Sequence, residues 1–329
     1  MIPIERIREA QPLLTRYLPR TPLIESPPIA AMLGTRTFLK LETCSPVGSF
    51  KTRGAFVAIS EWLKSAGGET RSPRRRPRIV TASSGNHGMA VAYAARILGA
   101  DATVYISEHA SPTKIEAIRG QGAAIVRTGR DFDEAKEAGK AYATEGGGWW
   151  LEDGKNPDVA VGTGTIGLEI VEDLPEVDEI LVPVGSGALI GGIGSAVRSS
   201  GADTEITGVQ PESAPAMVRS FAAGKPVPTD SCETIADGLA SRVPVPKALE
   251  LMREVTNRMV EVSEEAITFS VRALVEWAHL LAEPASAAAL AGALERREEL
   301  VGKNVVLVIT GANIDRAVLL HCLGATSNV

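Results

Sequence analysis

Cysteines, aromatic side chains and long apolar runs are all scarce in this sequence of 329 residues. The three cysteines, Cys44, Cys232 and Cys322, are widely spaced and include no CxxC pair. This pattern argues against a disulfide framework or a structural zinc site and is typical of the reducing cytoplasm. No apolar run approaches the roughly 18 residues of a membrane span, and the charged start of the chain does not resemble a secretory signal. We therefore expect a cytoplasmic protein without a membrane partner.

Positive charge is also in short supply. Lysine and arginine total 34 against 40 aspartates and glutamates, which gives a formal net charge of −6, and aromatic residues make up 4% of the chain. Nucleic-acid binding needs a basic field and stacking side chains, so we expect no nucleic-acid partner. The four histidines, His87, His109, His279 and His321, are dispersed and form no HExxH pair. We therefore expect no metal site.

What the sequence does have is glycine, with 32 residues, and an alternation of short apolar runs with longer helical stretches. Single helices between short strands imply parallel sheets buried on both faces, which is an α/β fold. The chain length predicts about two domains. Apolar runs rich in β-branched residues predict strands at 78–82, 102–106, 123–128, 149–153, 179–184, 205–210 and 305–310.

The most irregular stretch is KSAGGETRSPRRRPR, residues 64–78, which holds three consecutive arginines between Pro73 and Pro77. Proline, glycine and serine at this density favour a loop. We interpret it as a solvated loop between a helix and the next strand. A basic binding patch is the alternative, since charge runs serve both purposes.

The first candidate site is SFKTRGA, residues 49–55, which predicts a helix start with Ser49 as its N-cap. Lys51 then lies in the first turn, where the positive end of the helix dipole and the nearby Arg53 disfavour an ammonium ion. A neutral amine is the form that nucleophilic lysine chemistry needs. Gly54 allows close approach of another element. Taken alone, the motif also fits an ordinary surface lysine.

The second candidate is ASSGNHG, residues 82–88, directly after a predicted strand. A strand-to-helix turn of this kind presents backbone N–H groups to a carboxylate or phosphate. Ser84 also carries a hydroxyl that suits acid–base chemistry. Simple helix capping by the serines or Asn86, and packing by His87, are the structural alternatives.

Two later turns complete the set. VPVGSGALIGGIG, residues 182–194, ends a strand and opens a helix on small residues, which favours an anion such as phosphate. It only approximates the dinucleotide fingerprint, because Ile190 stands at the third glycine position, so we do not expect NAD. VITGANID, residues 308–315, ends a strand at Thr310, whose hydroxyl suits either a ligand nitrogen or a local turn hydrogen bond.

In this order, S-F-K-x-R-G, S-S-G-N-H-G, the glycine-rich turn and T-G-x-N resemble the pyridoxal-phosphate enzymes of fold type II, in the threonine and serine dehydratase and serine racemase group. The resemblance runs from about Thr21 to Ile314 and includes GTGTIGLE, IADGLA and EPASA. It implies an α/β fold with two parallel-sheet, three-layer α/β domains and the cofactor in the cleft. The implied division is a small domain of residues 50–148 and a large domain of 1–49 plus 149–329, assembled as a homodimer.

The resemblance also implies residue roles. Lys51 is the lysine that bonds to pyridoxal phosphate and later removes the substrate's α-proton. Phe50 packs beside the ring, Asn86 hydrogen-bonds its 3-hydroxyl oxygen and Thr310 faces its nitrogen. The phosphate would be held by the backbone N–H groups of Gly185, Ser186, Gly187, Ala188 and Leu189. Substrate contacts would come from Ser83, Ser84, His87 and Ser241. Asp237 and Glu283 match positions near the site without an assigned role.

The activity implied is β-elimination from a β-hydroxy amino acid such as threonine or serine, giving a 2-oxo acid and ammonia. A racemase that uses Ser84 as its second acid–base group is one alternative, and a lyase for a bulkier amino acid of osmolyte or natural-product metabolism is another. The chain departs from the family pattern in GSGA, in TGAN and in WWLEDGKNP, residues 149–157. Gln210 and Ala216 stand where serine racemase has acidic residues for a divalent cation, which predicts that this cation site is absent.

Overall fold

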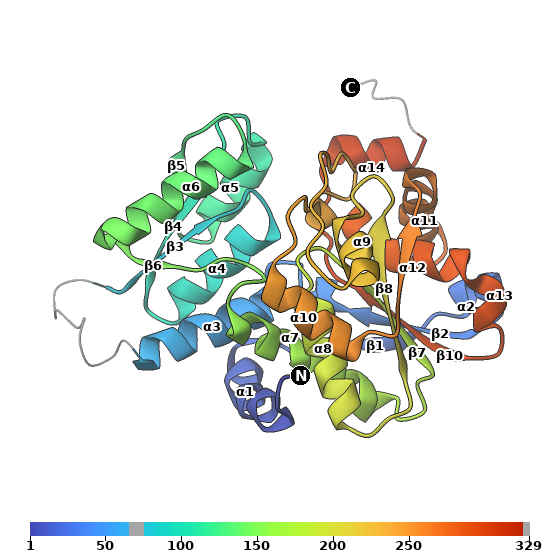
Figure 1. Ribbon diagram of the computed structural model, residues 1–329. Helices are drawn as coiled ribbons and strands as arrows, with labels where there is room; N and C mark the ends of the chain where they lie inside the picture. The colour runs from blue at the N-terminus through green and yellow to red at the C-terminus, as the bar shows by residue number, and fades with distance from the viewer. Residues whose placement is uncertain (66–75, 325–329) are drawn as a thin grey trace.

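The structure, a computed structural model, describes residues 1–65 and 76–324. Most of the sequence-predicted loop at 64–78 therefore lies outside the described residues. Two lobes lie side by side, the smaller one formed mainly by the first half of the chain (Figure 1). Within the described ranges, no helix combines the length and the apolar character that crossing a bilayer would require.

Each lobe is built on its own sheet. The larger sheet has the order β1-β2-β10-β7-β8-β9 and the smaller one β5-β4-β3-β6. All pairs are parallel except β1 with β2, so the predicted α/β class with parallel sheets is confirmed. The strands are β1 Leu23–Glu25, β2 Arg36–Leu41, β3 Arg78–Ala82, β4 Asp101–Ile106, β5 Ala124–Arg127, β6 Trp149–Trp150, β7 Glu179–Pro183, β8 Glu205–Pro211, β9 Arg258–Val262 and β10 Asn304–Ile309.

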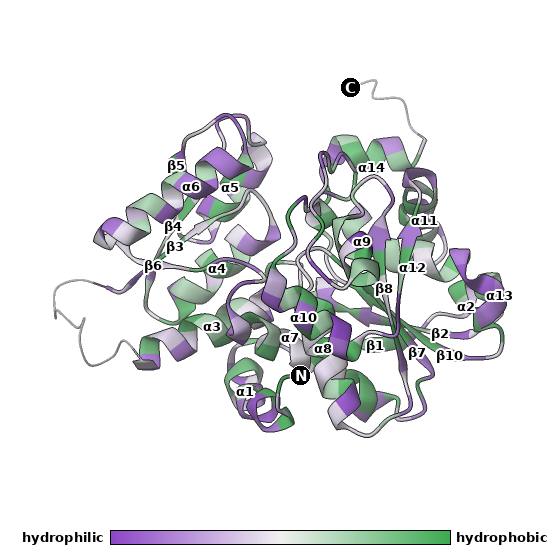
Figure 2. Ribbon diagram, viewed as in Figure 1, coloured by the Kyte–Doolittle hydropathy of each residue, from purple (hydrophilic) through white to green (hydrophobic). Residues whose placement is uncertain are grey.

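Helices cover both faces of each sheet, which gives the three layers expected. In the small lobe α3, α4 and α5 pack on one face and α6 on the other; in the large lobe α2, α11 and α12 lie opposite α7, α8 and α10. Apolar residues accordingly concentrate along the strands and on the helix faces turned toward them (Figure 2). The helices are α1 Ile4–Tyr17, α2 Pro27–Leu33, α3 Lys51–Ser65, α4 Asn86–Ile97, α5 Pro112–Gly120, α6 Phe132–Tyr142, α7 Pro157–Asp173, α8 Ala188–Ser199, α9 Ala216–Ala223, α10 Pro246–Val255, α11 Glu264–Glu276, α12 Pro284–Glu295, α13 Arg297–Leu300 and α14 Arg316–Cys322.

The sheets also define where the lobes meet. Strand β6 pairs with β3 in the smaller sheet. By sheet membership the boundary therefore lies after Trp150, whereas the sequence placed it after Gly148. The division into domains of 50–148 and 1–49 plus 149–329 otherwise stays a prediction.

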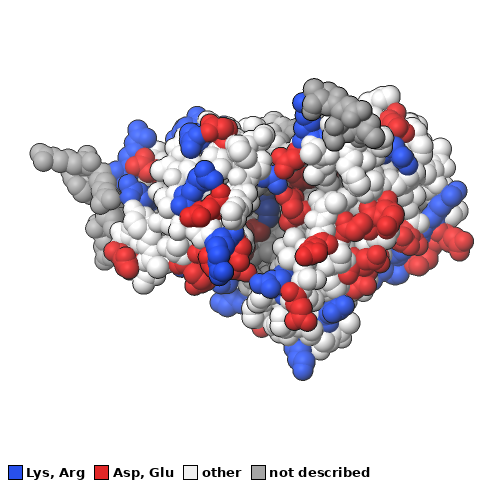
Figure 3. Space-filling model, turned by 90° about the horizontal axis from the view of Figure 1, so that it is seen from above, with Lys and Arg blue, Asp and Glu red and all other residues white. Residues whose placement is uncertain are grey.

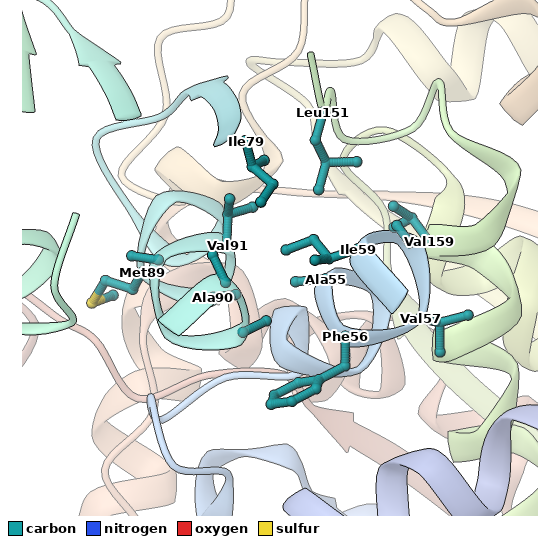
Figure 4. Packing of buried hydrophobic residues seen from close by; sticks show 14 of the residues in the cluster. Ala55, Phe56, Val57, Ile59, Ile79, Met89, Ala90, Val91, Leu151 and Val159 are labelled. Atoms are coloured by element: carbon teal, nitrogen blue, oxygen red, sulfur yellow. The ribbon is translucent and has the colours of Figure 1, made fainter. Parts of the chain in front are cut away.

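Helix α3 is fixed between the lobes by close packing. Its Ala55, Phe56, Val57 and Ile59 lie among Ile79, Leu151, Val159 and the α4 residues Met89, Ala90 and Val91 (Figure 4). A Cβ on Gly54 would lie 2.7 Å from Val159 Cγ1, and one on Gly162 would lie 2.4 Å from the Arg53 carbonyl oxygen. The close approach that the sequence predicts at Gly54 is therefore to α7, and it leaves α3 little freedom to move.

A buried ionic cluster also holds helix α3 in place. Arg53 donates to Glu42 Oε2 at 2.9 Å and to Glu169 Oε1 at 2.6 Å, and Lys40 donates to Glu169 Oε2 at 2.6 Å. The Arg53 charge, which we expected to act on Lys51, is instead paired with the two carboxylates of Glu42 and Glu169. The pairing also explains how Lys40, a buried residue of β2, is tolerated away from solvent.

Candidate active site

Lys51 is the first residue of α3 and points toward the junction of the lobes. Its Nζ donates to Asp153 Oδ2 at 2.6 Å, and the two side chains are 17% and 22% exposed. The Lys51 ammonium also lies 4.8 Å from the centre of the Phe50 ring. The predicted N-cap is not observed, since the helix begins at Lys51 and the buried Ser49 hydroxyl has no hydrogen-bond partner in the described part of the chain.

Asp153 was not among the predicted site residues, and it is the group closest to Lys51. Partial burial alone would raise the pKa of its carboxyl, but the Lys51 charge and hydrogen bonds from Lys51 and Ser186 lower this pKa to about 2. Ser186 Oγ donates to Asp153 Oδ2 at 3.1 Å. Beside the charged Lys51, Asp153 is therefore an anion, held between the lysine and the glycine-rich turn.

The glycine-rich turn between β7 and α8 is open to a ligand. The N–H groups of residues 185–189 meet no acceptor among the residues that the structure describes. Gly187 has φ +92°, a conformation that L side chains rarely adopt, and a Cβ on Gly185 would lie 2.8 Å from the Gly238 carbonyl oxygen. Free N–H groups at the start of a 12-residue helix attract an anion.

Asn86, at the start of α4, lies across from the end of β10. Its Nδ2 donates to Glu283 Oε1 at 2.7 Å, and its Oδ1 accepts from Asn313 Nδ2 at 2.7 Å. Asn313 in turn donates to the Val47 carbonyl at 2.8 Å, just before Lys51 in the chain. Three stretches that are distant in the sequence, ASSGNHG, VITGANID and EPASA, therefore meet at Asn86.

Glu283 is buried, with 6% of its surface exposed. This burial raises the pKa of Glu283 to about 7, although the hydrogen bond from Asn86 acts in the opposite direction. The residue is therefore partly protonated near neutral pH, and its proton is linked to folding.

We expect Glu283→Gln to flatten the pH dependence of stability. The carboxyl binds its proton more tightly when folded than when unfolded, so its contribution is greatest below the unfolded pKa near 4.5 and is lost as the pH rises through about 7. The wild type should lose up to about 3 kcal/mol more than the variant between pH 4.5 and 8. Denaturant unfolding of both proteins at the two pH values measures this, and parallel profiles would contradict it.

Ser83, Ser84 and His87 share the turn before α4. Ser83 Oγ accepts from the Gly85 N–H at 3.1 Å, which is a local turn bond. Ser84 forms no hydrogen bond within the described residues, and its backbone N–H is free. His87 is buried, and burial lowers its pKa although the Asp153 charge acts in the opposite direction, so its imidazole is neutral. Its Nε2 is left without a partner in the described chain.

Thr310 follows β10 and is buried. Its carbonyl accepts from the Phe50 N–H at 3.0 Å, and Ser49 bridges to Gly311 in antiparallel fashion. The end of the central strand is thus tied directly to the start of α3. Its role toward a ring nitrogen stays a prediction.

Ser241 is the predicted residue that the structure connects least to the others. It lies two residues beyond the short 3-10 helix η4, Asp237–Leu239, is partly buried, and forms no hydrogen bond with Lys51, Ser84 or Asn86. Its role as a substrate contact also stays a prediction.

Ion pairs between charged side chains connect the two lobes near the site. Lys114 of α5 pairs with Asp237 and lies 3.5 Å from Asp315, and Arg242 pairs with Asp133 of α6 at 3.0 Å. A space-filling view shows a hollow between the lobes with charged groups of both signs around it (Figure 3). Asp237, without an assigned role in the sequence, therefore bridges the lobes.

These contacts test whether the site suits pyridoxal phosphate. The cofactor needs a primary amine, an anion cradle and polar partners for its ring. Lys51 supplies the amine and residues 185–189 the free N–H groups. Three buried polar atoms in the same region, Ser49 Oγ, His87 Nε2 and Asp153 Oδ1, have no protein partner within the described residues. The residues present fit the group.

Gln210, which stands at the suspected cation position, binds backbone N–H groups instead. Gln210 Oε1 accepts from the N–H groups of Met217 and Val218, at 3.0 and 3.1 Å, and so caps α9. Within the described residues no cluster of three or more histidine, cysteine or acidic side chains is arranged to hold a metal ion.

Comparison with known proteins places the chain in a family. A model of the pyridoxal-phosphate dependent enzymes matches residues 14–311. The chain is 38% identical to the L-threonine ammonia-lyase of Thermotoga maritima over 315 residues, covering 96% of this chain and 76% of that protein.

Solved structures agree with this. The processed form of threonine deaminase isoform 2 from Solanum lycopersicum superposes with a TM-score of 0.90 at 28% identity, covering 98% of this chain and 93% of that one. Maize serine racemase gives 0.88 at 29% identity, covering 98% and 96%. The predicted fold type II architecture and pyridoxal phosphate as cofactor are thereby confirmed. With the family model matching most of its length, the chain belongs to the pyridoxal-phosphate-dependent enzymes.

Proposed function

We propose that this enzyme catalyses β-elimination from a β-hydroxy amino acid of the threonine and serine type, giving a 2-oxo acid and ammonia. The observation that carries the proposal is the contact of the Lys51 amine with Asp153 at 2.6 Å, since Asp153 also accepts from Ser186 in the turn whose N–H groups are free. The 38% identity to an L-threonine ammonia-lyase supports the choice of substrate.

Bound pyridoxal phosphate supplies the electron withdrawal that makes the substrate's α-proton acidic. In this proposal the N–H groups of residues 185–189 hold its phosphate, and Asn86 and Thr310 contact its ring. The free N–H of Ser84 and the start of α4 receive the substrate carboxylate. The Lys51 amine takes the α-proton as general base.

The overall reaction balances without an oxidant. The α-proton and the β-hydroxyl leave as water, and hydrolysis of the resulting enamine consumes one water and releases ammonia with the 2-oxo acid. A panel of L-amino acids, assayed for both products, tests the proposal. We expect equal amounts of 2-oxo acid and ammonia from L-threonine or L-serine; release of neither would contradict it.

Racemisation is the second candidate, and the unpartnered Ser84 side chain favours it. Maize serine racemase, at 29% identity, is also among the similar structures. A two-base racemase needs a proton donor on the face opposite Lys51, whereas elimination does not.

We expect Ser84→Ala to weaken L-substrate binding modestly and to keep elimination. If Ser84 were the second base, the change would abolish inversion by roughly 10²-fold or more. Wild type and variant are incubated with L-serine and L-threonine in deuterated water. Recovery of α-inverted, deuterated substrate from the wild type alone would overturn our choice in favour of a racemase.

We further propose a cytoplasmic homodimer. Three unpaired cysteines suit a reducing compartment. Trp277 and Leu281, 40% and 47% exposed after α11, offer apolar surface for a second copy. Analytical ultracentrifugation of the purified enzyme measures this directly, and a monomer at micromolar concentration would contradict it.

A further inference from the structure

Two departures from the family pattern contact one another in the site. Ser186 belongs to GSGA and Asp153 to WWLEDGKNP, and their side chains are joined by the 3.1 Å hydrogen bond. Gly154 makes this possible. It has φ +77°, and a Cβ there would lie 2.7 Å from Ser186 Cβ. The unusual stretch is therefore packed against the unusual loop as one unit.

This unit places a carboxylate beside the reacting atoms. Asp153 Oδ2 lies 2.6 Å from Lys51 Nζ, the atom proposed to take the α-proton. A substituent on the substrate's β-carbon is two bonds from the α-carbon. With the α-carbon bound next to Lys51 Nζ, we take this substituent to lie within roughly 5–7 Å of the Asp153 carboxylate, which is inside the range of charge interaction in a half-buried site.

The neighbouring groups do not cancel this charge during turnover. Among the described residues, Lys51 is the one cation that hydrogen-bonds Asp153, and it must be a neutral amine to accept the α-proton. His87 is neutral. Glu152, next in the chain, is directed to Lys136 and Lys155, at 2.8 and 3.0 Å. The β-substituent thus faces a carboxylate whose other hydrogen-bond partner among the described residues, Ser186, is neutral.

We propose that Asp153 is a specificity-determining residue that admits substrates with a neutral or cationic β-substituent and rejects those with a carboxylate on the β-carbon. The proposal rests on the function proposed above and narrows its substrate class. Serine and threonine satisfy the rule, because a hydroxyl can donate to the carboxylate. A 3-hydroxyaspartate would place a second anion against it. Like charges at this separation should lower binding by about 10- to 100-fold.

Binding of two unreactive isosteres tests the rule without turnover. L-Asparagine and L-aspartate differ in β-substituent charge but hardly in shape, and neither has a β-leaving group. Titrated into the holoenzyme and followed through the cofactor's absorbance, L-asparagine should bind at least about 10-fold more tightly than L-aspartate. In Asp153→Asn the ratio should fall to within about 3-fold.

Two further variants separate charge from packing. Ser186→Ala removes the hydroxyl but keeps the carboxylate, so the preference for L-asparagine should persist. Asp153→Ser removes the charge with a smaller side chain and should lose the preference, which covers the case in which Asp153→Asn does not fold. Equal binding of the two ligands by the wild type, or an unchanged ratio in the folded Asp153 variants, would overturn the proposal.

A kinetic comparison separates this proposal from the one it rests on. Wild type and Asp153→Asn are compared on L-serine and L-threo-3-hydroxyaspartate, and the ratio of their kcat/KM values should shift toward the acidic substrate in the variant. If the wild-type enzyme eliminates neither substrate, the proposed function is wrong. If it eliminates L-serine but the ratio of the two kcat/KM values is the same in wild type and Asp153→Asn, only the role of Asp153 is wrong.

Discussion

Replacing Lys51 with alanine should lower kcat for elimination by about 10³-fold or more, because the change removes the group that we propose as both covalent attachment point and general base. The amine lies in the site with 17% of its side chain exposed, and its nearest charged neighbour is Asp153. Steady-state assays and the absorbance of the purified protein measure the two losses. The fold should survive, since Lys51 is the first residue of α3 and the helix is held by Arg53 and its apolar face.

A matched control lies on the same helix. Lys64 is 69% exposed near the end of α3 and pairs with Glu61. Lys64→Ala should leave kcat within about 2-fold, since exposed pairs of this kind contribute little. A Lys51→Ala enzyme as active as this control would show that another amine performs the chemistry.

Replacing Gly187 with aspartate should cost cofactor affinity about 10²-fold or more while the protein still folds. The position has φ +92°, which strains any L side chain, and a Cβ there would lie 3.0 Å from Met217 Cε. Aspartate tolerates the left-handed region better than most residues, which limits the effect on folding. Its carboxylate would meet the phosphate at N–H groups that otherwise favour an anion. Equilibrium dialysis with pyridoxal phosphate measures the affinity.

Gly302→Asp separates backbone strain from charge repulsion. Gly302 has φ +79° and no atom within 4 Å of an added Cβ, so it carries the same strain in open space. This variant should retain its cofactor. Loss of cofactor in both variants to the same degree would mean that the glycine-rich turn is not the phosphate site.

The alternation of strands and helices predicted much of the fold, because parallel strands are buried on both faces and read as apolar runs. The runs at 78–82 and 179–184 match β3 and β7 closely. Strand β2, RTFLKL, gave no such signal because Lys40 interrupts it, and the partners that make this lysine tolerable, the Thr21 carbonyl and Glu169, lie elsewhere in the chain. Strand β9, RMVEV, contains two charged residues and is largely half-buried, so it lacked the continuous apolar pattern.

The site was predictable where motifs are local and less so where partners are distant. Lys51, Asn86 and the turn at 185–189 each stand in a recognisable stretch. Asp153 was missed, although WWLEDGKNP stood out as a departure from the family pattern, because the contact with Lys51 spans 102 residues. Lys114 likewise carried no signal, since its partners Asp237 and Asp315 belong to the other lobe.

The most direct measurement is to reduce the yellow holoenzyme with borohydride and map the modified peptide by mass spectrometry. Reduction fixes the cofactor to the lysine that carries it. The account predicts the label on the peptide containing Lys51 and on no other. Label on Lys114, which pairs across the lobes with Asp237, or on the buried Lys40 would contradict the assignment of the site.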